Sequence, residues 1–107
     1  MKIIEFPCYT NFGDGDSTDW KIEVGLTDDE YSRLESALED IDIEYPEIEF
    51  FQNKDLEDIF KKVYALAVKQ ATADSLAYDD DLRYKYGDNP EWKADDLYDI
   101  NVEYPEL

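Results

Sequence analysis

An amphipathic segment near the middle of the chain constrains the fold more than any other feature of the sequence. Its apolar residues recur at spacings of three and four: Leu56, Ile59, Phe60, Val63, Leu66, Ala67 and Ala71. This period predicts an α-helix with one apolar face, and Asn53 is a suitable residue to cap its start. The lysines of the segment fall on the opposite face, where we expect them to be solvated or to face acidic residues: Lys54, Lys61, Lys62 and Lys69. We therefore expect a long scaffold helix within residues 54–78.

The first 26 residues show the pattern of a β-hairpin. Residues 2–6 read as a short strand, and residues 20–26 alternate apolar with polar or small side chains, which is the period of a half-buried strand. Residues 11–19 between them are rich in Gly, Asp, Asn and Ser, which favour turns. We expect two antiparallel strands joined by a long loop.

A helix start follows this hairpin. Thr27 and Glu30 have the spacing of a capping box, in which each side chain accepts a hydrogen bond from the backbone of the other residue. Leu26 and Tyr31 flank the box at the positions of a hydrophobic staple. Apolar residues then continue at helical spacing, which predicts a helix over residues 28–40.

The remaining predicted elements are shorter. We expect a short strand over residues 48–51, loops at 79–81 and 87–90, a short helix from 89–91 to near residue 98, and a last strand over 100–104. Together these elements predict an α+β fold, with a small, mostly antiparallel sheet made of the N-terminal hairpin and the C-terminal strand. Two or three helices should pack on one side of that sheet. A length of 107 residues fits a single domain over residues 1–107.

Two segments of the chain resemble each other. Residues 38–48 and 97–107 agree at seven of eleven positions, and each contains the tripeptide Tyr-Pro-Glu, at 45–47 and at 104–106. We interpret both as a helix end that runs into a strand stopped by Pro. The alternative is a duplicated recognition segment that presents Tyr-Pro-Glu to a partner with two sites.

The chain has 29 acidic and 10 basic residues, a formal net charge of −19, and most of the acids lie in two blocks. Residues 27–49 hold ten acids and one base, Arg33, whereas residues 79–107 hold ten acids and three bases. Nucleic acids and anionic membranes attract clusters of Lys and Arg, so direct binding to either is not expected. The partner that this charge would attract is a basic surface on another protein.

The residues that commonly carry chemistry form no catalytic pattern. The chain has no His, the commonest general base and a frequent metal ligand. Asp14, Asp16 and Thr18 have the spacing of a phosphotransfer loop and of the start of a calcium loop. A calcium loop, however, needs Gly at its sixth position and Glu at its twelfth, where this chain has Asp19 and Gly25. We therefore predict a protein that is not an enzyme, without a cofactor or a resident metal.

The single cysteine gives an expectation about the compartment. Cys8 has no second cysteine in the chain with which to form a disulfide, and no cationic cluster near it in sequence would lower its pKa. We expect it to be a small buried apolar residue. No segment has the pattern of a signal peptide or is long and apolar enough to span a membrane, so we expect a cytoplasmic protein.

The candidate partner-binding residues form two acidic patches and a set of aromatic anchors. Rings interleaved with acids are typical of protein-binding surfaces. The first patch is Asp28, Asp29, Glu35, Glu39, Asp40 and Asp42. The second patch is Asp79, Asp80, Asp81, Asp95, Asp96 and Asp99. The anchors are Tyr84, Tyr86 and Trp92.

The charge of the chain predicts a non-catalytic binding protein that docks on a basic, nucleic-acid-binding protein or nuclease and inhibits it. A compact chain of this length has a diameter of about 33 Å, and duplex DNA of equal length carries about 19 charges. In charge character the chain resembles DNA-mimic inhibitors such as anti-CRISPR proteins, and the immunity proteins that block nuclease toxins. The alternative is an ordinary α+β interaction domain or assembly subunit whose acidity serves solubility.

Overall fold

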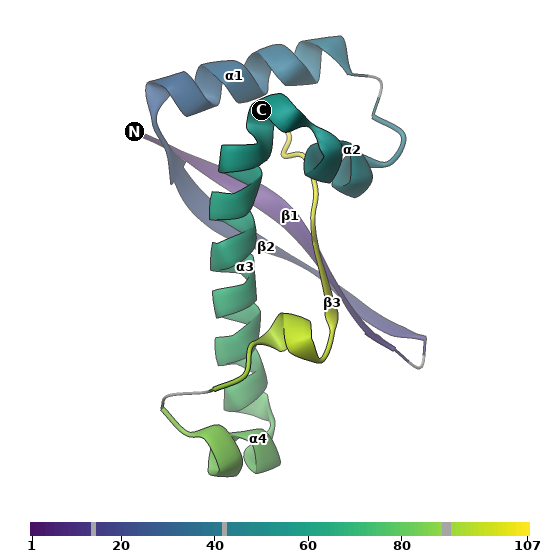
Figure 1. Cartoon of the computed structure of the whole chain (residues 1–107), viewed down its shortest axis with the longest axis vertical. Helices are drawn as coiled ribbons and strands as arrows, with labels where there is room; N and C mark the ends of the chain where they lie inside the picture. The colour runs from purple at the N-terminus through teal and green to yellow at the C-terminus, as the bar shows by residue number, and fades with distance from the viewer. Residues whose placement is uncertain (14, 42, 89–90) are drawn as a thin grey trace.

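The computed structural model describes residues 1–13, 15–41, 43–88 and 91–107. Within them the chain forms a three-stranded antiparallel sheet of order β2-β1-β3 and four α-helices (Figure 1), which confirms the α+β prediction. The strands are β1 (Lys2–Gly13), β2 (Asp16–Leu26) and β3 (Asp99–Val102). The helices are α1 (Asp28–Asp40), α2 (Pro46–Gln52), α3 (Glu57–Tyr78) and α4 (Asp80–Tyr86), with short 3-10 turns η1 (Lys54–Leu56) and η2 (Ala94–Asp96).

The N-terminal hairpin is confirmed, but its strands are longer than predicted. The paired ladder runs from Lys2 to Asn11 of β1 without a break, so the long loop predicted over residues 11–19 is wrong. The turn-forming residues lie in strands because cross-strand bonds satisfy their backbone groups, which local propensity does not foresee. Gly13 and Gly15 have φ angles of 79° and 80° near the tip, a conformation that glycine adopts without strain.

Helix α1 begins with the predicted capping box and has the predicted bounds. The Thr27 hydroxyl accepts from the Glu30 N–H at 3.2 Å, and Glu30 Oε1 accepts from the Thr27 N–H at 2.9 Å. Lys62 of α3 also donates to Glu30 Oε1, at 3.1 Å. These bonds, the Thr27 N–H first, lower the pKa of the Glu30 carboxyl. The capping box therefore both starts α1 and ties it to α3.

Helix α3 is the scaffold that its apolar period predicted. The Asn53 side chain accepts from the Asp55 N–H at 3.1 Å and so caps the 3-10 turn η1 that leads into the helix. Ile59 and Val63 are completely buried. Leu66, in contrast, is 41% exposed, so its predicted place on the buried face is wrong. It lies at the edge of the apolar stripe, beside β2.

One of the shorter predicted elements, the strand over residues 48–51, is wrong. The strand predicted over residues 48–51 is part of helix α2, because Pro46 at the first turn favours a helix start. Phe50 of α2 is completely buried and contacts the rings of Phe6, at a centroid distance of 6.0 Å, and Tyr104, at 4.9 Å. This packing holds α2 against the sheet.

The predicted loop at 79–81 is also wrong, because helix α4 starts there. The Asp79 carboxylate accepts from the N–H groups of Asp81 and Leu82 and caps the helix, and Gly87, with a φ of 54°, ends it. The short helix predicted from 89–91 to near residue 98 is reduced to the turn η2. Its predicted cap at 89–90 lies outside the described residues.

The twin segments 38–48 and 97–107 adopt different structures. In the first copy Pro46 begins helix α2, whereas the second copy contains β3 and continues without a helix. The tyrosines of the two Tyr-Pro-Glu motifs differ accordingly: Tyr45 is 55% exposed and Tyr104 is 4% exposed. The interpretation that both copies run from a helix end into a strand is therefore wrong for the first.

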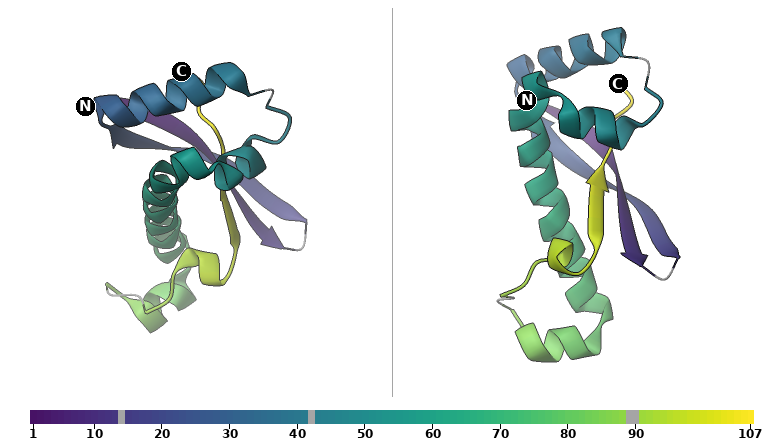
Figure 2. Two further views of the ribbon diagram at one scale, coloured as in Figure 1. Left: turned by 45° about the horizontal axis from the view of Figure 1, so that its top comes forward. Right: turned by 45° about the vertical axis from the view of Figure 1, so that its right-hand side comes forward.

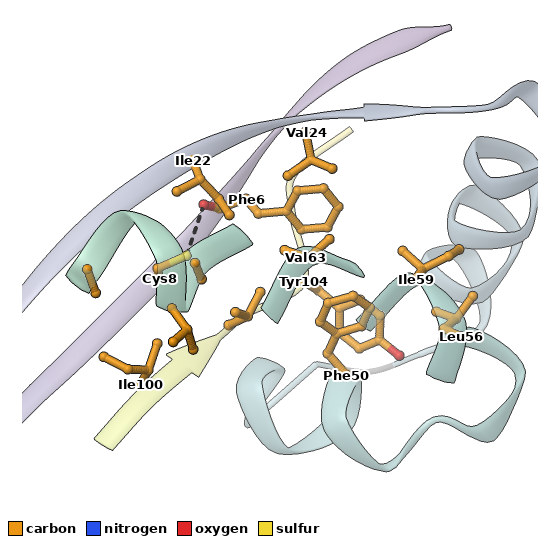
Figure 3. Close-up of a cluster of buried hydrophobic side chains, with 14 of the residues drawn as sticks. Phe6, Cys8, Ile22, Val24, Phe50, Leu56, Ile59, Val63, Ile100 and Tyr104 are labelled. Atoms are coloured by element: carbon orange, nitrogen blue, oxygen red, sulfur yellow. Dashed lines mark hydrogen bonds between the residues drawn. The ribbon is translucent and has the colours of Figure 1, made fainter. Parts of the chain in front are cut away.

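The hydrophobic core lies between one face of the sheet and the helices. Figure 3 shows Phe6 and Val24 of the sheet facing Val63 of α3, with the tilted rings of Phe50 and Tyr104 in contact beside them. The opposite face of the sheet stays in solvent, because alternate strand residues point away from the helices. One-sided packing, as predicted, leaves a whole sheet face available for other contacts.

The molecule is elongated, with principal-axis extents of 46 × 31 × 20 Å and a radius of gyration of 15.0 Å. Helices α1 and α4 lie at opposite ends of the long axis (Figure 1). The diameter of about 33 Å expected for a compact chain is therefore too small along this axis. Figure 2 shows the cause: α3 runs along the molecule and carries α4 beyond the end of the sheet.

Candidate functional site

The first predicted acidic patch lies on the solvent side of α1. Five of its six carboxylates are exposed: Asp28, Asp29, Glu35, Glu39 and Asp40. Asp29 is partly neutralised, because its carboxylate accepts from Arg33 Nε at 3.0 Å. The sixth, Asp42, lies outside the described residues. The α1 acids thus share one helix face.

The last turn of α1 carries acids where they oppose the helix dipole. Glu39 and Asp40 lie there, and no basic residue balances them. At a helix C-terminus a cation stabilises the helix by about 0.3–1 kcal/mol, whereas a carboxylate interacts unfavourably with the helix dipole. These two acids therefore do not serve the stability of the helix.

The acids of the second predicted patch are divided among α4 with its cap, the turn η2 and strand β3. Asp79 caps α4 and Asp80 pairs with Arg83, at the end of the molecule away from α1. Asp95 accepts from the Tyr64 hydroxyl at 3.2 Å, and Asp96 accepts from the Lys93 N–H at 2.9 Å. Most of these acids therefore have local structural bonds. Two members keep exposed carboxylates without such a bond in the described part of the chain: Asp81 and Asp99.

The three predicted aromatic anchors are placed very differently. Tyr84 is 94% exposed, Tyr86 is half-buried, and Trp92 is only 8% exposed. The rings of Tyr86 and Trp92 meet edge to face at 5.7 Å, so Tyr86 covers the buried indole. The expectation that Trp92 is a surface anchor is wrong, because the segment that carries it is held on α3 by the bond from the Ala94 N–H to Thr72 Oγ1, at 2.9 Å.

The structure reveals an acidic surface that the sequence reasoning missed, on the open face of the sheet. Glu5 of β1 lies directly opposite Glu23 of β2, and Tyr9 lies opposite Asp19. Glu103 follows β3, and its N–H donates to the Pro7 carbonyl at 2.9 Å. The alternation of residues 19–25 could have predicted the outward side of β2, but only the strand pairing brings these acids together.

The electrostatics of this face are unfavourable to the fold. Like charges directly opposite on neighbouring strands are destabilising, and Glu5 and Glu23 are such a pair. Lys21 relieves the pair in part, with its Nζ 3.4 Å from Glu5 Oε1. Burial raises the pKa of the Glu103 carboxyl, and the neighbouring Glu47 and Asp19 raise it further.

Glu106 links the sheet acids to α1. It lines one shallow hollow together with Glu5 and Glu103, and a second together with Glu35 and Glu39 of α1. The carboxylates therefore continue from the open sheet face to the solvent side of the helix. We call this set the acidic face: Glu5, Asp19, Glu23, Glu35, Glu39, Glu103 and Glu106.

Ion pairs compensate only a small part of the acidic charge. In the described part of the chain, six carboxylates lie within 4 Å of a Lys or Arg nitrogen: Glu5, Asp29, Glu30, Glu57, Asp58 and Asp80. Only Glu5 of these belongs to the acidic face. The other members of the acidic face therefore keep their charge available to a partner.

The other candidate sites can be placed as well. Cys8 is buried, as expected, and its thiol donates weakly to the Phe6 carbonyl. Asp14 of the calcium-like spacing lies outside the described residues. Across the described ranges, no group of three or more Cys, Asp or Glu is arranged to hold a metal ion, and no helix there has the length and apolarity to cross a membrane.

Comparisons of the chain with models of known protein families, with curated proteins and with solved structures found no match.

Proposed function

We propose that the protein is a non-catalytic binding protein whose acidic face docks on a basic surface of a nucleic-acid-binding protein and blocks it, as a DNA-mimic inhibitor or a nuclease immunity protein does. The observation that carries the proposal is the continuity of carboxylates from the open sheet face to α1. Lys21 neutralises one of these carboxylates, Glu5, in part. A surface of one sign steers an oppositely charged partner and raises its association rate.

The placement of the acids supports binding over solubility as the reason for the charge. Solubility requires only that charges be exposed, and they can then be placed where they do not repel one another. Here Glu5 faces Glu23 across two strands, and Glu103 lies near Asp19 and Glu47. Charge that costs stability at specific positions is typical of a functional surface.

The dimensions support a partial match to a nucleic acid. A duplex as long as the 46 Å axis of the molecule carries about 27 charges, against the net charge of 19 here. The average charge density along the axis is thus about two thirds that of DNA. A cleft built for a duplex would attract this chain and lose affinity for it as salt is added.

The test is capture from a lysate of the native host by the immobilised chain, with identification of the captured proteins by mass spectrometry. We expect a basic nucleic-acid-binding protein that is released by salt and displaced by added duplex DNA. The partner should then bind a variant with Glu5→Gln, Glu23→Gln and Glu103→Gln several-fold more slowly at low salt, and with a weaker salt dependence.

A matched control carries the same change in charge elsewhere. The substitutions Asp74→Asn, Asp88→Asn and Glu91→Gln remove three exposed acids that lie outside the acidic face and outside both predicted patches. We expect this control to associate at nearly the rate of the unmodified chain. Equal slowing of both variants, or a captured protein that duplex DNA does not displace, would show the proposal to be wrong.

A further inference from the structure

A hollow of about 530 Å³ lies where β3 faces α2 and α3. The apolar and aromatic side chains of Ile48, Phe51, Phe60 and Tyr64 line it, together with residues 100–102 of β3. Successive strand side chains point to opposite faces of a sheet, so three consecutive residues line a hollow only where it borders the strand edge. The hollow therefore follows the edge of β3 that does not pair with β1.

The register shows which backbone groups face this edge. The Glu103 N–H donates to the Pro7 carbonyl of β1 at 2.9 Å, and the pairing continues with Tyr9 opposite Asn101. In an antiparallel pair the direction of the N–H and C=O groups alternates along the strand. The backbone groups of Ile100 and Val102 therefore point away from β1, toward the hollow.

These backbone groups have no protein partner in the part of the chain that the structure describes. Ile100 is 7% exposed and Val102 is 1% exposed, but both residues line the hollow, so their unpaired backbone groups border it. Backbone groups away from bulk water are almost always hydrogen-bonded. The opposite edge of the sheet differs, because Lys62 Nζ of α3 donates to the Gly25 carbonyl of β2 at 2.7 Å.

The walls of the hollow expose large apolar side chains to solvent. Ile48 is 47% exposed and Phe51 is 67% exposed. Phe51 meets Phe60 edge to face at 5.3 Å, and Phe60 stacks on Tyr64 at 5.6 Å. A row of apolar side chains beside a free strand edge is what an added strand needs to bury its own alternate side chains.

The charge around the hollow indicates the sign of its occupant. Glu47 lines the hollow, and Asp95 accepts a hydrogen bond from Tyr64. None of the lining residues that the structure describes is Lys or Arg. A second copy of this chain would bring another charge of −19 to the same place, so a basic segment is favoured as the occupant.

We propose that the edge of β3 binds an extended segment of the basic partner as a fourth strand, which bonds to the backbone of Ile100 and Val102. In this segment lysine or arginine alternates with an apolar residue that enters the hollow between α2 and α3. The inference rests on the proposed function, because it takes the partner to be a basic protein, and it adds the mode of docking.

The test uses amide hydrogen exchange measured by NMR. The probe is a blocked heptapeptide in which lysine alternates with valine, and its glutamate-for-lysine version is the control peptide. At saturating lysine peptide, we expect exchange at the Ile100 and Val102 amides to slow by about tenfold or more. The Asn101 amide, which faces β1, should change little, and the glutamate peptide should have no effect.

Two variants keep the result specific to the hollow. Ile48→Ser with Phe51→Ser should abolish the slowing of exchange, and both side chains are exposed enough to be replaced without loss of the core. Leu66→Ser removes a comparably exposed apolar side chain outside the hollow and should leave the effect intact. Slowing that survives the double variant would contradict the proposal.

Two further outcomes would also overturn it. If the lysine peptide shifts only the acidic face and leaves exchange at Ile100 and Val102 unchanged, the strand-docking proposal fails while the proposed function stands. If exchange at these amides is already slow in the free protein and depends on its concentration, with a dimer seen by light scattering, a second copy occupies the edge. Failure to find any basic partner by capture would instead count against the proposed function.

Discussion

Arg33 of α1 and Asp58 of α3 form a two-point ion pair, in which the two terminal nitrogens of the guanidinium each donate to one carboxylate oxygen at 2.9 Å. The same guanidinium also donates to Asp29 at 3.0 Å and to the Asp55 carbonyl at 3.1 Å. Arg33 is the only base among residues 27–49. It therefore fixes the most acidic stretch of the chain to the neutral scaffold helix.

Replacing Arg33 tests this connection. The fork of arginine matches a carboxylate at two points, which lysine cannot do. We expect Arg33→Lys to lower the midpoint of thermal unfolding by a few degrees, measured by circular dichroism. Arg83→Lys, which alters the exposed pair with Asp80 within α4, should change the midpoint less. An equal change in both variants would mean that the two-point geometry does not matter.

The same pair predicts a pH dependence. Hydrogen bonds from Arg33 lower the pKa of Asp58 to about 2. A carboxylate with a lowered pKa stabilises the native state above its unfolded pKa, and this contribution is lost as the pH falls toward 2. The stability difference between the unmodified chain and Asp58→Asn should therefore shrink on acidification over this range, measured by urea unfolding at each pH. A difference that is constant with pH would contradict the assignment.

Glu103 should contribute to stability with the opposite dependence on pH. Burial raises its pKa above the ordinary value of a glutamate, and Glu47 and Asp19 raise it further. The native state therefore holds this proton more tightly than the unfolded state, so stability falls as the pH rises through the raised pKa. We expect Glu103→Gln to gain about 0.5 kcal/mol of unfolding free energy at neutral pH and to lose this advantage in acid. No gain at neutral pH would show that the carboxylate is not repelled by its neighbours.

The twin Tyr-Pro-Glu motifs provide a matched pair of substitutions. The Tyr104 hydroxyl accepts from the Asn53 amide at 3.0 Å and donates to the Glu49 carbonyl at 3.4 Å, whereas Tyr45 is 55% exposed. We expect Tyr104→Phe to lower the unfolding free energy by about 1 kcal/mol, because it removes the partner of the Asn53 amide and the Glu49 carbonyl in a partly buried site. Tyr45→Phe should stay within about 0.5 kcal/mol of the unmodified chain. Similar values for both would contradict the different structures of the two copies.

Cys8 should be protected from thiol reagents. Burial, with a smaller contribution from Glu103, raises its pKa to about 12, and only the thiolate reacts readily. We expect a chromogenic disulfide at mildly alkaline pH to react with Cys8 of the native protein at a rate on the order of 100-fold lower than its rate with the protein unfolded in urea. Rapid labelling of the folded protein would show that the core around Cys8 of β1 opens easily.

The parts of the fold that depend on neighbours within one helical turn could be predicted from the amino-acid sequence. The capping box of Thr27 and Glu30 needs two side chains three residues apart, and its two hydrogen bonds form as predicted. The apolar period over residues 56–71 likewise required a long helix, whatever it packs against. Such features can be predicted from sequence because the geometry of one helical turn is enough to bring the interacting side chains and backbone groups together.

Identical residues in different surroundings, in contrast, adopt structures that depend on contacts between distant parts of the chain. Tyr-Pro-Glu begins a helix at 45–47 and lies in the extended chain after β3 at 104–106, because Tyr104 enters the core beside Phe50 and Tyr45 does not. The acidic face likewise combines acids from β1, β2, α1 and the C-terminal segment. Their charges are visible in the sequence, but their proximity depends on strand pairing between residues far apart in the chain, which local propensity does not specify.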